Sequence, residues 1–178
     1  MTTYISDSAH YKEVLARISQ VKHSLWIGTA DIKDVYMDLP AGCLVAQGNK
    51  KVPLLGVLTG LIRRGVEVRL IHAKEPGPNF RENFDKYPVL FSGLERVLCP
   101  RVHFKMVIMD GVLAYVGSAN LTGAGIGMKS DGKRNFEAGF LTDDAGLVGA
   151  AMTQFDNLWI GRHCKTCRRR DYCGDPIK

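Results

Sequence analysis

The sequence predicts an α/β fold, an α/β/α sandwich around a central mixed β-sheet. Two observations predict it: short apolar runs that fit buried strands alternate with segments of helical periodicity, and one Asp-Gly turn separates two apolar runs in the second half of the chain. Alternating strands and helices favour parallel pairing, whereas the turn favours an antiparallel hairpin, so the sheet is mixed. With 46% apolar and 24% charged residues among 178, the composition is that of a soluble domain and excludes a disordered or low-complexity chain.

The first half of the chain contains two predicted helices, each followed by a strand. Apolar residues at i, i+3, i+4 and i+7 within 11–18 mark one face of a helix. The apolar run 24–29 fits a buried strand, and residues 38–53 are rich in turn formers, which predicts a long surface loop. Helical spacing returns at 54–62, between a proline and a glycine, and a second strand follows at 66–71.

The second half predicts a hairpin and a long amphipathic helix. In order, its elements are a loop at 74–79, a short helix at 80–90, strands at 103–109 and 112–116, a flexible basic loop at 123–135, a strand at 136–141 and a helix up to residue 159. Asp110-Gly111 joins the two strands of the hairpin, because this dipeptide favours a two-residue turn. Asp143 and Asp144 suit the first turn of the last helix, where negative charge is stabilising.

Basic charge gathers at the C-terminus. The formal net charge is +6, of which residues 162–178 carry +4 and residues 1–161 only +2. We therefore divide the chain into a folded domain at 1–161 and a basic, Cys-rich tail at 162–178. A basic tail often contacts polyanions, although a solvated face has the same composition. Because the sequence shows neither a run of 18 apolar residues nor a signal-like N-terminus, we expect a cytoplasmic protein without a transmembrane segment.

Three of the five cysteines lie close together in the tail: Cys164, Cys167 and Cys173. Cys43 and Cys99 stand alone. In a chain without an export signal, C-x2-C spacing favours a metal site over disulfides. We expect structural zinc, with an iron–sulfur cluster as the alternative, bound by the three thiols and His163, with Cys99 as the other candidate for the fourth ligand. Three unligated thiols in a frayed tail are the plain alternative to a metal site.

The predicted hairpin brings four polar side chains of complementary chemistry together. His103 and Lys105 are two apart on a strand and therefore project from the same face. The chain turns at Asp110-Gly111, runs back, and presents Ser118 and Asn120 at the end where it started. An ammonium, a hydroxyl and an amide can hold phosphate oxygens, and an imidazole can attack phosphorus or move a proton. Each residue alone has a structural explanation, but the whole set at fixed offsets does not.

These offsets, H-x-K-x4-D-x6-G-S-x-N beginning at His103, match the signature of the phospholipase D superfamily, the HKD motif. The resemblance extends to Asn135-Phe136-Glu137, which opens a strand where family members carry a glutamate, and to the basic helix end and strand at 63–70. It covers roughly residues 5–160 and leaves the Cys-rich tail outside. The resemblance implies that residues 1–161 are a phospholipase D-like catalytic domain.

The resemblance also implies a role for each motif residue. His103 is the nucleophile that forms a phosphohistidine intermediate, and Lys105 and Asn120 hold the non-bridging oxygens, assisted by Ser118. Glu137 accepts a hydrogen bond from the other imidazole nitrogen and fixes the tautomer. No cofactor and no catalytic divalent metal are implied, because a covalent histidine route with cationic clamping can perform the chemistry.

One motif supplies only half of an active site, because family members use one histidine as nucleophile and another as general acid. Asp110 completes the motif, although in the family it resembles a structural residue more than a catalytic one. His72-Ala-Lys74 has the H-x-K spacing, but Asn79 replaces the aspartate and no G-S-x-N follows. We interpret that segment as a chance match or as part of a pocket rim. The resemblance therefore implies a homodimer, in which a two-fold axis places the same patch of each copy against the other.

Single-motif members of the superfamily include small nucleases and dimeric lipid-processing enzymes, so the motif indicates the reaction rather than the substrate. The net charge, the basic segment 129–134 and the Arg-rich tail favour a nuclease that cleaves nucleic-acid phosphodiester bonds. A phospholipase D-type lipid hydrolase or transferase is the first alternative, since anionic lipids also attract basic residues. A non-catalytic nucleic-acid-binding module is the second, although a pure binder needs no nucleophile.

Overall fold

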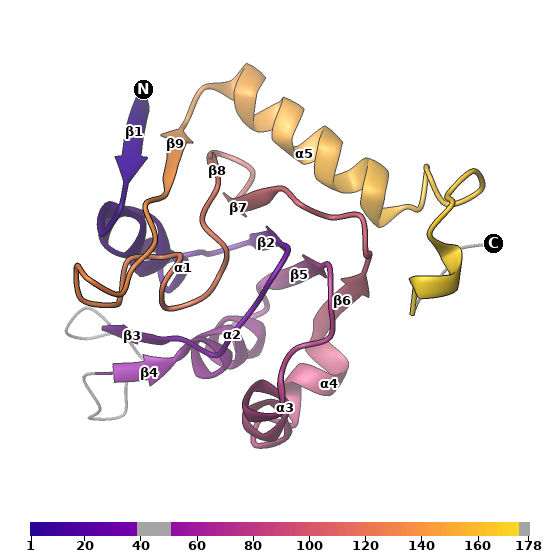
Figure 1. Cartoon of the computed structure of the whole chain (residues 1–178), viewed down its shortest axis with the longest axis horizontal. Coiled ribbons are helices and arrows are strands. Elements are labelled where there is room, and N and C mark those ends of the chain that lie inside the picture. Colours follow the sequence, from indigo (N-terminus) through magenta and orange to yellow (C-terminus); the bar gives the residue numbers. More distant parts are fainter. Residues whose placement is uncertain (39–50, 175–178) are drawn as a thin grey trace.

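Seven strands form one mixed sheet in the order β1-β9-β8-β7-β2-β5-β6 (Figure 1). The computed structural model describes residues 1–38 and 51–174. The strands of this sheet are β1 (Thr2–Ser6), β2 (Ser24–Thr29), β5 (Glu67–His72), β6 (Leu94–Leu98), β7 (Lys105–Met109), β8 (Leu113–Gly117) and β9 (Ala138–Thr142). β2, β5 and β6 pair in parallel, and the other neighbours pair antiparallel. The predicted mixed sheet is confirmed.

Helices cover both faces of the sheet, which gives the predicted α/β/α sandwich (Figure 1). The helical segments are η1 (His10–Leu15), a π-helical turn that continues into α1 (Ala16–Ile18), then α2 (Leu54–Arg63), α3 (Pro78–Asp85), α4 (Val89–Gly93), α5 (Ala145–Trp159) and the 3-10 turn η2 (Arg170–Tyr172). β3 (Tyr36–Asp38) and β4 (Lys51–Pro53) form a separate two-stranded ladder. Within the described ranges, no helix is long and apolar enough to cross a membrane.

The two faces of the sheet carry separate hydrophobic cores, because side chains alternate across each strand. On one face Val107 belongs to the larger core, with Leu15 of η1. On the other face Met106 belongs to a smaller core, with Phe155 of α5. Strand β7 is buried along its whole length, which explains why its sequence is a continuous apolar run after Lys105.

Arg69 of β5 fastens α5 to the sheet. Its guanidinium lies over the rings of Trp26 and Trp159, 5.0 and 5.1 Å from their centroids. The same side chain forms ion pairs with Glu95 at 2.9 Å and with Asp156 of α5 at 3.7 Å. Because the guanidinium is planar and stacks on aromatic faces, one arginine connects strand, helix and the α5 core.

The β7–β8 hairpin is confirmed, with a connection one residue longer than predicted. Met109 pairs with Leu113, so Asp110, Gly111 and Val112 form the turn. Asp110 and Gly111 have positive φ angles of 54° and 65°, which this dipeptide tolerates, and the Val112 N–H donates to the Met109 carbonyl at 3.1 Å.

Several segments differ from the sequence predictions. β1 and β6 were not expected, because each is a short edge strand with few buried side chains. β4 falls inside the predicted loop 38–53, of which residues 39–50 lie outside the described residues. The predicted helix 80–90 is two helices, since Pro88 disfavours helical conformation in the preceding residue. Residues 123–135 were expected to form a flexible loop, but Ile126 is buried in the larger core.

Gly28 in β2 allows the ring of Phe104 to pack against the backbone. A Cβ at Gly28 would overlap that ring, so Gly28→Ala should destabilise the fold by about 1–3 kcal/mol, as overpacked cores do. Because Phe104 lies between His103 and Lys105, activity should fall as well. Equilibrium denaturation measures the first effect, and the cost should shrink in a Phe104→Ala background.

Gly149 on α5 provides the matched control, because a Cβ there meets open space. Gly149→Ala should be neutral or stabilising by about 0.5–1 kcal/mol. A Gly28→Ala protein as stable as Gly149→Ala would contradict the packing argument.

Candidate active site

The chain segments that carry His103, Lys105, Ser118, Asn120 and Glu137 meet at one edge of the sheet, where β7 begins and β8 ends. The C-terminal ends of β2, β5, β6 and β8 lie there together with the N-terminal ends of β7 and β9, because β7 and β9 run antiparallel to their neighbours. His103 and Lys105 enter β7 at this edge, Ser118 and Asn120 follow β8, and Glu137 precedes β9. Open α/β sheets bind ligands at the carboxyl ends of their parallel strands, so this edge is the candidate active site.

His103 is exposed, and Lys105 lies directly behind it. The Lys105 Nζ donates to the His103 carbonyl oxygen at 2.6 Å and lies 3.3 and 3.4 Å from the two ring nitrogens. Only 5% of Lys105 is exposed. Burial lowers the pKa of Lys105, and the carboxylate of Glu137 opposes this shift. An exposed imidazole beside a fixed ammonium can meet one phosphate with both groups at once.

Ser118 and Glu137 link β8 to β9. The Ser118 hydroxyl donates to one Glu137 carboxylate oxygen and accepts the backbone N–H of Ala138 at 3.0 Å. The Nδ2 group of Asn135 donates a hydrogen bond to the other Glu137 oxygen at 3.0 Å. In the part of the chain that the structure describes, no hydrogen bond joins Glu137 to His103, which differs from the implied tautomer-fixing role. Glu137 here orients Ser118 and supplies the negative charge near Lys105.

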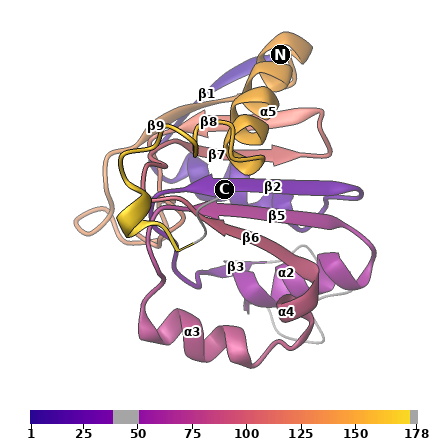
Figure 2. The same cartoon turned by 90° about the vertical axis from the view of Figure 1, so that its right-hand side faces the viewer.

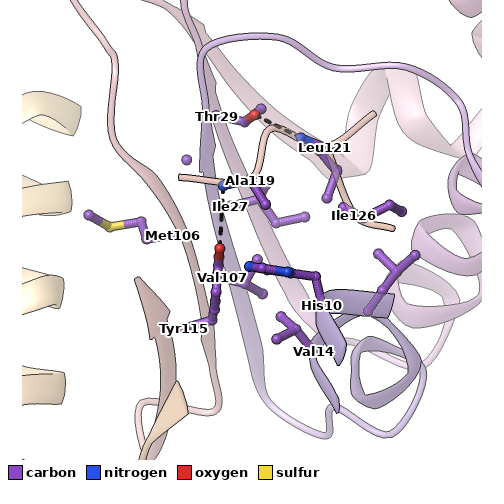
Figure 3. Close-up of a pocket in the computed structure, with 12 residues that line it drawn as sticks. His10, Val14, Ile27, Thr29, Met106, Val107, Tyr115, Ala119, Leu121 and Ile126 are labelled. Atoms are coloured by element: carbon purple, nitrogen blue, oxygen red, sulfur yellow. Dashed lines mark hydrogen bonds between the residues drawn. The ribbon is translucent and has the colours of Figure 1, made fainter. Parts of the chain in front are cut away.

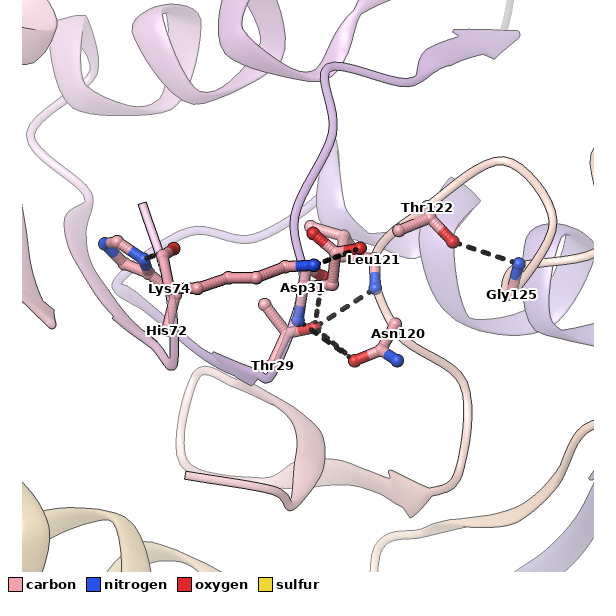
Figure 4. A network of polar contacts seen from close by, with 8 residues as sticks. All are labelled: Thr29, Asp31, His72, Lys74, Asn120, Leu121, Thr122 and Gly125. Atoms are coloured by element: carbon pink, nitrogen blue, oxygen red, sulfur yellow. Dashed lines mark hydrogen bonds and ion pairs between the residues drawn. The ribbon is translucent and has the colours of Figure 1, made fainter. Parts of the chain in front are cut away.

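Asn120 is held with its amide in one orientation. Its Oδ1 accepts the backbone N–H of Asp31 at 3.1 Å and lies 3.4 Å from the hydroxyl of Thr29 (Figure 4). Thr29 in turn accepts the backbone N–H of Leu121 at 3.1 Å. Since the oxygen is engaged, the Nδ2 donors are on the other side of the amide and can bind a phosphate oxygen.

Tyr115 supports the turn after β8 from the core side. It lines a cavity of about 20 Å³ behind the edge and meets His10 of η1 edge to face, with 5.3 Å between ring centroids (Figure 3). Its hydroxyl accepts the backbone N–H of Ala119 at 3.4 Å. Burial raises the pKa of Tyr115 to about 12, so the phenol stays neutral at physiological pH. This bond positions the turn that presents Ser118 and Asn120.

His72 and Lys74 adjoin the site but do not form a second motif. His72 is buried, and its Nδ1 lies 2.8 Å from the Lys74 carbonyl oxygen. The exposed Lys74 ammonium forms an ion pair with Asp31 at 3.2 Å, beside Asn120 (Figure 4). Lys74 is thus on the rim of the site, and the buried His72 is in no position to act as the second catalytic histidine.

Asp110 lies at the opposite end of β7 from His103, so the structure separates it from the other predicted site residues. Its carboxylate accepts the backbone N–H groups of Lys22, His23 and Ser24 at 3.1, 2.7 and 3.1 Å. Burial alone would raise the pKa of Asp110, but these three donors together lower it. We therefore correct its grouping with the catalytic residues: Asp110 ties the hairpin turn to the start of β2.

The predicted tail ligands are not assembled around a metal position. Cys164, Cys167, Cys173 and His163 line one cavity, and Cys99 lines it with them. Among the residues that the structure describes, no three or more Cys, His, Asp or Glu side chains are grouped so that they could hold a metal ion. The ligand set predicted from spacing alone is therefore not preformed.

Comparison with known protein families identifies the fold. A family model described as "Cardiolipin synthase, PLD-like domain" matches residues 14–159, which is most of the chain. The chain belongs to the phospholipase D superfamily. This membership supports a phosphodiesterase-type activity. None of the curated proteins compared with the chain matches it.

Solved structures share the superfamily fold at low sequence identity. NucT from Helicobacter pylori is 15% identical with a TM-score of 0.60, over 88% of this chain and 94% of that one. Nuc from Salmonella typhimurium, a phospholipase D family member, is 16% identical with a TM-score of 0.61, over 89% and 93%. TrmBL2, an archaeal chromatin protein described as showing a novel mode of DNA binding, is 13% identical with a TM-score of 0.54, over 89% and 52%. At these identities the likeness shows the fold alone.

Three residues that shape the site were not predicted from the sequence: Thr29, Asp31 and Asn135. Thr29 and Asp31 contact Asn120 from about ninety positions away, and the only signal in the sequence was their place at the end of an apolar strand. Asn135 stood in the segment that resembles the family, but its bond to Glu137 depends on the turn between them.

The role of Asp110 predicts a pH-dependent stability. Because its folded pKa is lowered below the unfolded value of about 3.9, its contribution is fully present above that value and is lost as the pH falls through the folded pKa. Asp110→Asn should lower the free energy of unfolding at pH 7 by about 1–2 kcal/mol and flatten its decline below about pH 4. Denaturant titrations at several pH values measure both effects.

Asp171→Asn, an exposed aspartate of the tail, is the control and should leave the pH profile unchanged. If Asp110→Asn abolished turnover while folding as stably as the parent, Asp110 would belong to the chemistry after all.

Proposed function

We propose that this chain is a phosphodiesterase, namely a nuclease that cleaves nucleic-acid phosphodiester bonds through a phosphohistidine at His103. One observation carries the proposal: an exposed imidazole lies directly over the buried ammonium of Lys105, at the edge where Ser118 and Asn120 offer further hydrogen bonds. Superfamily membership supports phosphodiester chemistry at this edge.

The proposed reaction has two steps. A ring nitrogen of His103 attacks phosphorus, a P–N bond forms, and the P–O bond to the leaving group breaks as that oxygen takes a proton from a second imidazolium. Water then attacks phosphorus and gives its proton to the second imidazole, and the P–N bond breaks to regenerate His103. Lys105 and the Asn120 amide stabilise the negative non-bridging oxygens in both steps, so the scheme assigns no step to a divalent metal.

We propose that a second copy of the chain supplies the second imidazole. Within the described residues, the motif occurs once and His72 is buried, so we expect the general acid to come from outside the monomer. In a homodimer with two-fold symmetry, the same edge of each copy faces its partner, which brings the two His103 side chains to one site.

An exposed apolar row next to this edge suits such an interface. Tyr4, Phe140 and Val116 are directly opposite one another across β1, β9 and β8, and all three are exposed. The Tyr4 and Phe140 rings meet edge to face at 5.6 Å. Phe136, immediately before Glu137, is 93% exposed. Contiguous exposed apolar side chains commonly mark protein–protein contacts, and the strands β8 and β9 that carry this row lead to Ser118 and follow Glu137.

Nucleic acid suits the charge around the site. The chain carries a net charge of +6, and its basic tail lies at the end of the sheet where β2, β5 and β6 finish (Figure 2). Arg101, two residues before His103, and Lys74 are both exposed there. Such charges attract a phosphate backbone by releasing its counterions. The description of the matching family favours a lipid substrate as the second candidate, since anionic lipids attract the same charges.

The first test is a panel of phosphodiesters with EDTA present. We expect cleavage of single-stranded DNA, duplex DNA or RNA, no cleavage of a phospholipid, and an acid-labile phosphoenzyme that His103→Ala removes. Lys105→Ala should reduce turnover by at least about 10²–10³, the cost of losing one donor to a developing charge. His23→Ala, an exposed histidine at the other end of the sheet, should retain full activity.

The other outcomes of this test would overturn the mechanism or favour a different function. Turnover that EDTA abolishes, or that survives His103→Ala, would overturn the mechanism. Cleavage of phospholipid alone would favour the lipid enzyme, and tight nucleic-acid binding without turnover of any phosphodiester would favour the binding module.

The second test concerns the shared site. If catalysis needs His103 from both copies, exchange of parent subunits with His103→Ala subunits should lower activity as the square of the parent fraction. Phe140→Glu places a charge in the apolar row and should therefore produce an inactive monomer. Light scattering measures the oligomeric state.

Val112→Glu is the control for that substitution, since Val112 is also an exposed apolar residue but lies in the turn at the far end of the hairpin. A linear fall of activity on mixing, or a fully active Phe140→Glu monomer, would show that one copy suffices.

A further inference from the structure

Four of the five cysteines line one cavity between the tail and the body of the protein. The cavity has a volume of about 120 Å³, and its walls include Cys99, Cys164, Cys167 and Cys173. All four are free thiols and partly buried. Cys99 directly follows β6, whereas the other three belong to the tail more than 60 positions later. The fold therefore joins a lone cysteine of the body to the cluster.

Local hydrogen bonds already bring the thiols toward this cavity. The Cys167 N–H donates to the Cys164 carbonyl at 3.1 Å, which is the tight turn that a C-x2-C ligand pair uses. The Cys173 thiol donates to the carbonyl of Leu98 at 3.7 Å, next to Cys99 in the chain. The cluster therefore has two halves: the Cys164–Cys167 turn, and Cys173 beside Cys99.

Hydrogen-bond donors and basic side chains lie close to the cluster. The backbone N–H of Arg169 donates to the Cys167 sulfur at 3.4 Å. Four thiols that bind one divalent ion release four protons and leave a net charge of −2 at the site. The exposed Arg101 and the arginine run 168–170 can balance that charge.

Cys99 is a better fourth ligand than His163. His163 is exposed and directly precedes Cys164, so both side chains would have to turn inward from adjacent positions of one short turn. Cys99 lines the same cavity but belongs to the body of the protein, directly after β6. A tetrahedral site needs donors on all sides of the ion, and only a residue of the body supplies the missing side.

We propose that Cys99, Cys164, Cys167 and Cys173 bind one zinc ion, which fastens the C-terminal tail to the segment that leads into the catalytic strand. The thiols are not yet gathered closely enough to hold an ion in the described residues, so zinc binding draws the tail inward and closes the cavity. The anchor on the body lies four residues before His103, and the backbone carbonyl oxygen of Cys99 accepts the N–H of Val102 at 2.9 Å. Zinc therefore stiffens the 99–103 turn and keeps the basic tail beside the active-site edge.

The test measures metal directly in the full-length protein. Purification without added metal should give one equivalent of zinc, and replacement by Co²⁺ should give the thiolate-to-cobalt charge-transfer bands and the intense visible bands of a tetrahedral sulfur site. Cys99→Ser should weaken Co²⁺ binding by about 10–100-fold or more, because it removes a ligand rather than an outer partner. Cys173→Ser, which changes only the tail, should do the same and leaves the sheet intact.

Two variants define the ligand set, and chelation gives an independent readout. His163→Ala and Cys43→Ser should bind Co²⁺ as the parent does. A strong chelator should release the tail, which limited proteolysis detects as cleavage between residues 160 and 174.

Metal-free protein with four alkylatable thiols, disulfides among these cysteines or an iron–sulfur chromophore would each overturn the zinc site. Parent-like affinity in Cys99→Ser, or its loss in His163→Ala, would overturn the ligand assignment. Metal content and Co²⁺ spectra do not depend on turnover, so this result is separate from the test of the phosphodiesterase.

Discussion

The register of the β7–β8 hairpin is the constraint on which the site depends. Lys105 pairs with Gly117, so the residues that enter β7 and the residues that leave β8 meet at one edge. A slip of one residue would turn every side chain of a strand to the other face and remove Lys105 from its place beneath His103. The register is held at the other end by Asp110, whose carboxylate binds three consecutive N–H groups of the chain entering β2. A residue of the motif therefore holds the register of the hairpin from its far end.

A buried cation explains much of the remaining architecture at this edge. Lys105 is almost completely buried, and an ammonium in that position needs a hydrogen-bond acceptor and a nearby negative charge. The His103 carbonyl provides the first and Glu137 the second. Glu137 is in turn held by Ser118 and Asn135, which connects three antiparallel strands through one charge network. The imidazole is left exposed above this network, as its proposed role as a nucleophile requires.

Three features of the surface next to the site are explained by a second copy of the chain or by a bound ion. The apolar row on β1, β9 and β8 is exposed, and the motif occurs once in the described residues. Between the tail and the body lies a cavity that is lined by thiols. Each feature gains a physical explanation if it is completed from outside: the row and the single histidine by a second copy, and the thiols by a metal ion. The proposed dimer and the proposed zinc site address different parts of this edge, so either can hold without the other.

The sequence by itself determined the sandwich, the hairpin and the family, because these depend on patterns within about twenty residues. Alternation, helical spacing and the Asp-Gly turn are local, and the motif lies on a single hairpin. The edge strands β1 and β6 were not predicted, since a half-exposed strand carries little apolar pattern. Only the tertiary structure decided that Thr29 and Asp31 orient Asn120, that Glu137 bonds to Ser118, that Asp110 lies away from His103, and that Cys99 lines one cavity with the tail cysteines. These contacts join residues that are distant in the chain, and the strand order that brings them together is set by the packing of the whole sheet.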